Sequence, residues 1–274
     1  MKLYPLLFLD EAAKSVQEAL QENLALFVDK NEEGLQAVLI KIPEVEAGLQ
    51  EMVKTIQANP DAYKNQNVAL HQLAGILVHA VKGNVGAYLH MDPEMGLYEV
   101  FGSSAQDKFG PLTYEIIMGL IYPYYLRSDA SITKHAVQVW DKMYERADVS
   151  KIWLGNLSAE ELEKGFKAIG LRIPASEAST FSNITEEEYK SEFYPDVNPH
   201  IGPLYAYRLK PNSETNRAYR SLHENGSALV AKFHKELVKF FPSLKRQDLV
   251  EKLFTHAGYL HFRSVYKPEE AISL

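Results

Sequence analysis

Cysteine is absent from this sequence of 274 residues, which excludes disulfide bonds, thiolate metal ligands and cysteine nucleophiles. Positive charge is also scarce, since 29 lysines and arginines against 36 aspartates and glutamates give a formal net charge of −7. Non-specific nucleic-acid binding needs a basic surface, so we expect no nucleic-acid partner. No apolar run approaches the roughly 20 residues of a membrane span, so we expect no membrane partner. The short apolar run at the start is interrupted by Pro5 and followed by acids, which favours a cytoplasmic protein without a signal peptide.

Several motifs with a known chemistry are missing too. The sequence contains no GxxxxGK[ST] phosphate loop, no GxGxxG, no GxSxG and no HExxH. None of the nine histidines has a glutamate three residues before it, which is the spacing used in carboxylate-bridged di-iron bundles. These absences disfavour the common hydrolases and ferritin-like metal sites.

Helical periodicity dominates the sequence, and the alternation typical of strands is nearly absent. One helix should run from Asp10 to about Phe27, and a long helical segment from Ser213 through Phe241 with an interruption at Gly226. No fixed-period repeat and no Gly/Ser linker divides the chain. We therefore predict a single all-α domain over residues 1–274, built of about ten helices. Residues suited to begin the helices are Asp10, Pro43, Gly110, Asp129 or Ser131, Ser158, Thr185, Ser213 and Ser243.

The segment HQLAGILVHAVKGNVGAYLH places three histidines and three glycines at steps of three or four residues. Such spacing predicts one helix with these six residues on a single face, and a break near Lys82, Gly83 and Asn84 is the alternative. Glycine inside a helix costs about 1 kcal/mol relative to alanine, so close approach of a neighbouring helix or a flat ligand would explain the three glycines. We expect the middle histidine to be buried or to face a cavity, and the outer two to be more exposed. The six residues are His71, Gly75, His79, Gly83, Gly86 and His90.

His234 is surrounded by apolar residues three and four positions away, such as Val230 and Val238. The spacing predicts that its imidazole points into the protein. It is either a core histidine that donates to a backbone carbonyl or an axial ligand of a b-type haem. By contrast, His256 and His261 lie five residues apart around Gly258, and we interpret this segment as a helix end.

Three short segments together resemble the tryptophan and indoleamine dioxygenase superfamily of haem-dependent aromatic oxygenases. The resemblance implies an all-α enzyme that binds haem b and adds dioxygen to a small aromatic substrate. It implies His234 as the iron ligand, His79 as the distal base, and Ser103 and Ser104 in a turn over the haem edge. Gly75 and Gly83 would line the haem slot beside His79. The segments are ILVHAV, EVFGSSAQDKF and AYRSLHENGSALVAKFHKELVKFF.

Two other functions remain open from the residues. A non-enzymatic helical module could bind a partner helix or an apolar ligand in the glycine-rich groove. A non-haem iron oxidase could use His71, His79 and carboxylates from other helices. The sequence does not select a carboxylate-binding residue among Arg208, Arg217 and Arg220, and it leaves open whether the chain forms homo-oligomers.

Overall fold

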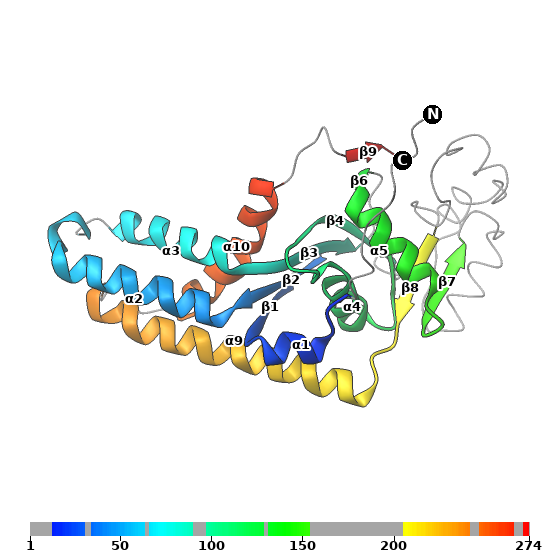
Figure 1. Ribbon diagram of the computed structural model, residues 1–274, viewed down its shortest axis with the longest axis horizontal. Coiled ribbons are helices and arrows are strands. Elements are labelled where there is room, and N and C mark those ends of the chain that lie inside the picture. Colours follow the sequence, from blue (N-terminus) through cyan, green and yellow to red (C-terminus); the bar gives the residue numbers. More distant parts are fainter. Residues whose placement is uncertain are drawn as a thin grey trace, which may run out of the picture.

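The chain folds as an α/β protein around a mixed sheet of seven strands, so the prediction of an all-α domain with ten helices is wrong (Figure 1). The computed structural model describes residues 13–30, 34–63, 66–89, 97–128, 131–153, 205–241, 247–265 and 271–273. The strand order in the sheet is β1-β2-β3-β4-β5-β8-β7. These strands are β1 (Leu24–Lys30), β2 (Gly34–Lys41), β3 (Val81–Leu89), β4 (Leu97–Ala105), β5 (Tyr125–Arg127), β7 (Val149–Trp153) and β8 (Tyr205–Leu209). Two short strands, β6 (Ser131–Thr133) and β9 (Ala271–Ser273), pair with each other.

Helices cover both faces of the sheet. Helices α2, α3 and α10 pack on one face, and α4 and α5 pack on the other. In Figure 1, α2, α3 and the second half of α9 extend beyond the sheet as an elongated helical lobe. No helix of the described segments is long and apolar enough to cross a membrane. The helices are α1 (Val16–Gln21), α2 (Ile42–Ala58), α3 (Gln66–Ala80), α4 (Gly110–Ile121), α5 (Lys134–Glu145), α9 (Ser213–Phe240) and α10 (Gln247–Val265), with a 3-10 turn at Pro60–Tyr63.

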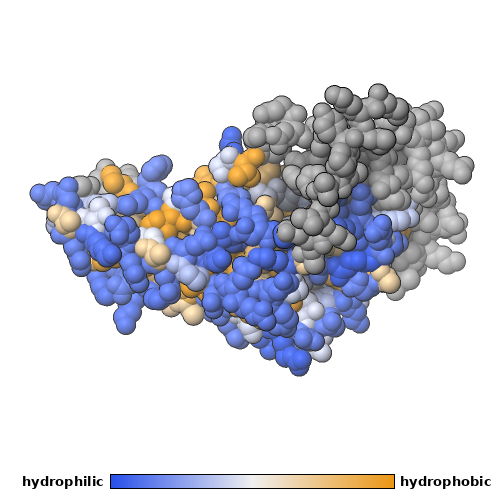
Figure 2. Space-filling model, in the orientation of Figure 1, coloured by the Kyte–Doolittle hydropathy of each residue, from blue (hydrophilic) through white to orange (hydrophobic). Residues whose placement is uncertain are grey.

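Strand β1 explains why the helix expected from Asp10 to Phe27 does not form over that range. Its residues alternate between the two apolar cores: Leu24 and Leu26 pack towards α4, whereas Ala25 and Phe27 pack towards α2, α9 and α10. Because both faces of the strand are buried, its sequence is a continuous apolar run, which periodicity alone does not distinguish from a helix. On the face shown in Figure 2, the coloured surface is mainly hydrophilic, with hydrophobic residues in smaller patches.

Helix α9 passes from one core to the other. Tyr219 and Leu222 in its first half belong to the α4 side, whereas Leu229 and Phe233 in its second half belong to the α2 side. Gly226 lies at the crossing, where a Cβ would stand 2.8 Å from the carbonyl oxygen of Leu26 in β1. The glycine therefore lets the helix lie directly against the edge strand.

The glycine and histidine segment is not one helix. Helix α3 ends at Ala80, and the chain continues as β3 from Val81, so Gly83 and Gly86 lie in a strand. A Cβ on Gly83 would come within 2.4 Å of Thr113 in α4, and one on Gly86 within 2.2 Å of the Phe101 ring. These glycines therefore allow side chains of α4 and β4 to pack on the sheet rather than forming one face of a ligand slot.

Several predicted helices are confirmed in place. Helix α2 begins beside Pro43, α4 begins at Gly110, and α9 spans the long segment predicted from Ser213. Helix α10 is described from Gln247, and the predicted start at Ser243 lies outside the described residues. The helix continues beyond His261 to Val265, so the helix end expected at His256 and His261 lies further along the chain. The helices predicted at Ser158 and Thr185 lie outside the described residues.

Candidate functional site

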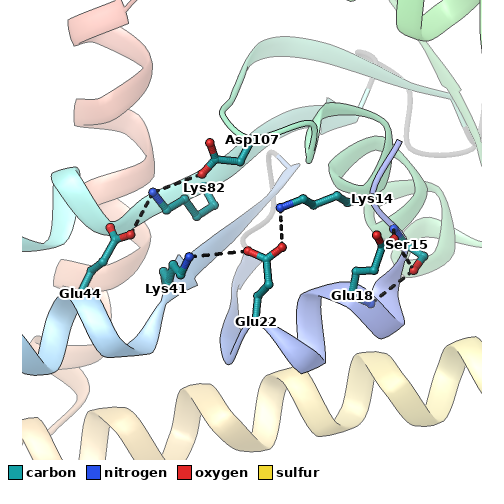
Figure 3. Close-up of polar contacts among 8 residues, drawn as sticks. All are labelled: Lys14, Ser15, Glu18, Glu22, Lys41, Glu44, Lys82 and Asp107. Atoms are coloured by element: carbon teal, nitrogen blue, oxygen red, sulfur yellow. Dashed lines mark hydrogen bonds and ion pairs between the residues drawn. The ribbon is translucent and has the colours of Figure 1, made fainter. Parts of the chain in front are cut away.

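Four connections of the chain meet at one end of the sheet (Figures 1 and 3). The antiparallel register places Lys41 at the end of β2 beside Leu24 at the start of β1, and Ala105 at the end of β4 beside Gly83 near the start of β3. Helix α2 begins here, α3 ends here, and α4 begins after a short loop. Loops and helix ends thus gather where binding residues are commonly held on a rigid scaffold.

A network of charges joins these connections. The side chain of Lys82 is only 9% exposed, and its Nζ lies 3.1 Å from Oε1 of Glu44 and 3.5 Å from Oδ2 of Asp107. Figure 3 shows Lys82 between these two acids, with Glu22 between Lys14 and Lys41 beside them. Lys82 therefore holds the loop after β4 against the start of α2.

The loop from β4 to α4 is tightly held. The backbone N–H of Gln106 donates to the carbonyl of Lys82 at 2.9 Å, and the N–H of Phe109 donates to the carbonyl of Gln106 at 3.1 Å. Asp107 and Lys108 between them have φ angles of 51° and 68°, in the left-handed region. This conformation turns the chain sharply and directs it into α4.

The N-terminus of α4 has no side-chain cap, whereas Ser15 caps α1 and Asn212 caps α9. Gly110 and Pro111 form the first positions of α4, and proline contributes no N–H. The first turn of a helix carries unsatisfied backbone donors and the positive end of the helix dipole. The α4 N-terminus can therefore receive an anionic group.

Strands β4 and β5 form a fork. They are the parallel pair of the sheet, and α4 connects them. Pairing covers three residues, with Leu97 opposite Tyr125 and Glu99 opposite Arg127, after which β5 ends. Strand β4 continues to Ala105, paired with β3 on its other edge alone within the described segments. Among the described residues, the backbone groups on the β5 side of residues 100–105 thus have no strand partner.

Ser128 lies at the base of this fork, directly after the last paired residue of β5. The residue is 2% exposed, and its Oγ has no hydrogen-bond partner among the described residues. A buried hydroxyl without a partner costs about 1–3 kcal/mol. Successive side chains of a strand lie on opposite sides, so Ser128 lies opposite Arg127 and on the same side as Leu126, towards α4.

On the other face of the sheet, a buried ion pair joins β4 to β5 at the base of the fork. Arg127 Nε donates to Oε2 of Glu99 at 2.7 Å, and the hydroxyl of Tyr88 donates to Oε1 of Glu99 at 2.6 Å. Both charged side chains are at most 12% exposed. Because Glu99 and Arg127 are also the last paired residues of β4 and β5, their side chains fix the point at which the strands part.

A second polar group lies on the α10 face of β4. Ser104 Oγ is 2.9 Å from Nδ1 of His261, and Gln106 Nε2 is 2.8 Å from Nε2 of the same ring. His261 is 3% exposed. Burial, together with the nearby charges of Lys82 and His79, lowers the pKa of His261 below its ordinary value. Sequence reasoning missed this residue, although Gly258 three positions before it marks the side of α10 that approaches the sheet.

The histidines and glycines that the sequence predicts on one helix face do not lie around a common site in the structure. His79 is exposed at the end of α3, so the expectation that it is buried or faces a cavity is wrong. Gly75 is also exposed, and a Cβ there would have nothing within 4 Å. His71 is exposed as predicted, and His90 lies outside the described residues. These positions therefore form no slot.

The remaining predicted residues also lie apart. Ser103 and Ser104 point to opposite faces of β4, since Ser103 Oγ lies 2.7 Å from the Tyr114 hydroxyl of α4. His234 is half-buried on α9 beside the buried Phe233. In the part of the chain that the structure describes, no group of three or more His, Cys, Asp or Glu residues could hold a metal ion, which corrects the expectation of a metal-binding protein.

Comparisons with protein-family models, curated proteins and solved structures give no match to this chain. The resemblance to haem-dependent oxygenases therefore stays a prediction from the sequence.

Proposed function

We propose that this protein binds a phosphate-bearing small molecule in the fork between β4 and β5, with its phosphate at the N-terminus of α4. The observation that carries the proposal is the early end of β5, after three paired residues, beside a β4 that continues to Ala105. Ligands of open α/β sheets bind in the crevice beyond the carboxyl ends of parallel strands. Strands β4 and β5 are the parallel pair in the described part of the sheet, so the ligand would bind beyond their carboxyl ends.

The start of α4 supports the anionic end of the ligand. Helix N-termini that follow a strand and a short loop bind phosphate through backbone N–H groups and the helix dipole. The loop before α4 is held by the Lys82 carbonyl and by the charge network, so these donors are positioned before the ligand arrives. Preorganised donors lose less entropy on binding.

The open edge of β4 supports the rest of the ligand. Free strand edges bind extended molecules through main-chain hydrogen bonds. Residues 102–104 of this edge are half-buried, which suits an elongated ligand that lies along the strand. Ser128 at the base of the fork provides a hydroxyl that such a ligand would satisfy. Elongated molecules that carry phosphate include nucleotide-containing cofactors.

Calorimetric titration with a panel of ADP, NAD⁺, FAD and coenzyme A tests the proposal. We expect at least one of the four to bind with one site per chain. Ser128→Ala should weaken that binding by about 0.5–1.5 kcal/mol, or roughly 2-fold to 12-fold in Kd.

Tyr219→Phe provides the matched control, since the Tyr219 hydroxyl of α9 is also buried without a hydrogen-bond partner in the described part of the chain but lies outside the fork. It should leave the affinity unchanged. Absence of binding by the whole panel, or equal affinity of the Ser128→Ala variant and the wild type, would contradict the proposal.

A further inference from the structure

We propose that Ser104 is an acyl-accepting nucleophile, with His261 as its general base, on the face of the sheet opposite α4. This second site goes beyond the ligand-binding fork and rests on different side chains. Ser104 Oγ and His261 Nδ1 are 2.9 Å apart, within the range of a nucleophile and its base. Ser104 is half-buried while His261 is buried, so the nucleophile is the more accessible of the two. The substrate class is a small carboxylic ester or thioester.

Helix α10 is brought close to the sheet by Gly258. A Cβ at this position would stand 2.5 Å from Val38, 2.7 Å from Oδ1 of Asn84 and 3.0 Å from Gln36. Positions three apart lie on the same helix face, so this close contact also directs His261 at β4. The absence of a side chain at Gly258 thus positions the base.

Gln106 orients the ring of His261 from its other nitrogen. When the amide oxygen of Gln106 faces Nε2, it accepts a hydrogen bond from the Nε2–H group and leaves Nδ1 free to accept the hydroxyl proton of Ser104. Rotation of the amide by half a turn exchanges its oxygen and nitrogen without moving the ring. Gln106 is therefore a positioning residue, as is the third member of a serine triad.

Asn84 supplies a donor for the developing oxyanion. It lies directly opposite Ser104 in the register of β3 and β4, where side chains on one face are about 4.5–5.5 Å apart at Cβ. Its amide oxygen already accepts a hydrogen bond of 2.7 Å from Gln36, which turns the NH₂ group away from Gln36. Side-chain amides of asparagine serve as oxyanion donors in acyl transfer.

The electrostatic surroundings keep His261 neutral at pH 7. Burial lowers the pKa of His261 most, and the positive charges of Lys82 on β3 and His79 on α3 lower it further. Lys82 is paired with Glu44 of α2 and Asp107 of the following loop, so these carboxylates moderate its effect. A neutral imidazole is the form that can accept a proton.

The proposed reaction is hydrolysis of an ester or thioester through an acyl-serine at Ser104. Ser104 Oγ attacks the acyl carbon while its proton passes to Nδ1 of His261, and an O–C bond forms. The bond to the alkoxide or thiolate then breaks, and His261 returns the proton to this leaving group. Water hydrolyses the acyl-serine in a second step, which restores the hydroxyl.

Labelling with a biotinylated fluorophosphonate tests the proposal on the full chain. Attack by Ser104 would form an O–P bond and break the P–F bond, with the proton passing to His261 and fluoride leaving. We expect one label per chain, mapped to Ser104 by peptide mass spectrometry. The labelling rate should rise with pH and level off near neutrality, because His261 titrates below its ordinary value of 6.5.

Matched variants separate a catalytic from a structural role. Ser104→Ala should abolish the label, whereas Ser103→Ala, which alters the neighbouring residue on the α4 face, should retain it. Gln106→Leu should lower the labelling rate at least fivefold and Gln106→Glu should retain most of it, because the glutamate keeps an acceptor oxygen. Failure of the folded wild type to label, or a label on any residue other than Ser104, would overturn the proposal without affecting the ligand proposed for the fork.

Discussion

Replacing Arg127 with methionine should lower the free energy of unfolding by about 3–5 kcal/mol, because it leaves the carboxylate of Glu99 buried without a counter-ion. The Arg127 side chain is 9% exposed and that of Glu99 is 12% exposed. Arg127 donates from both Nε and a terminal nitrogen to Oε2 of Glu99, while the Tyr88 hydroxyl holds Oε1. After the substitution, the Tyr88 hydroxyl is the remaining partner of the carboxylate among the described residues.

Urea denaturation of Arg127→Met beside Arg146→Met measures this difference. Arg146 pairs with Glu115 and Asp148, and its side chain is 31% exposed while that of Asp148 is 60% exposed. Loss of this more exposed pair should cost about 0–1 kcal/mol. The double variant Glu99→Met with Arg127→Met should regain most of the lost stability, since it removes both buried charges. If Arg127→Met costs no more than Arg146→Met, the pair does not hold the strands together at the fork.

Two further predictions concern the glycines and His261. Gly83→Ala should destabilise the fold by about 1–3 kcal/mol, because its Cβ would come within 2.4 Å of Thr113, whereas Gly75→Ala should stabilise α3 by about 1 kcal/mol, since nothing lies within 4 Å. Thermal unfolding of the two variants checks this. Equal effects of the two substitutions would contradict the different packing of Gly83 and Gly75. Because the pKa of His261 is lowered, the unfolded chain binds more protons, so stability should decline as pH falls below about 6.5. His261→Gln should remove that part of the decline, and an NMR titration of His261 that gives a pKa above 6.5 would refute it.

Local signals predicted several helices correctly. Pro43 and Pro111 suit the first turn of a helix, and the helical segment predicted from Ser213 matches α9, although α9 continues through Gly226, where an interruption was expected. These features depend on residues a few positions apart, so they can be recognised in the sequence alone.

The sheet was missed because its strands lack alternation. In β1 and β2 both faces are buried, so their apolar runs carry no period of two, and Gly83 and Gly86 continued the helical spacing of α3 by coincidence. The fork depends on where β5 ends relative to β4, and β5 comes twenty residues later in the chain. No local pattern encodes that register. His261 acquires its partners from β4, more than 150 residues away, so its spacing to His256 was uninformative.

Calorimetric titration of Ala105→Asp and Ala105→Asn with the ligand that binds the wild type tests the fork most directly. Ala105 ends β4 beside the start of α4, where a Cβ on Gly110 would lie 3.7 Å from that of Ala105. A carboxylate at this position would occupy the positive end of the helix and repel a phosphate. The account predicts that Ala105→Asp weakens binding about tenfold or more, or 1.4 kcal/mol and above, and that Ala105→Asn binds nearly as the wild type does. Equal affinities of the two variants would contradict a phosphate site at the N-terminus of α4.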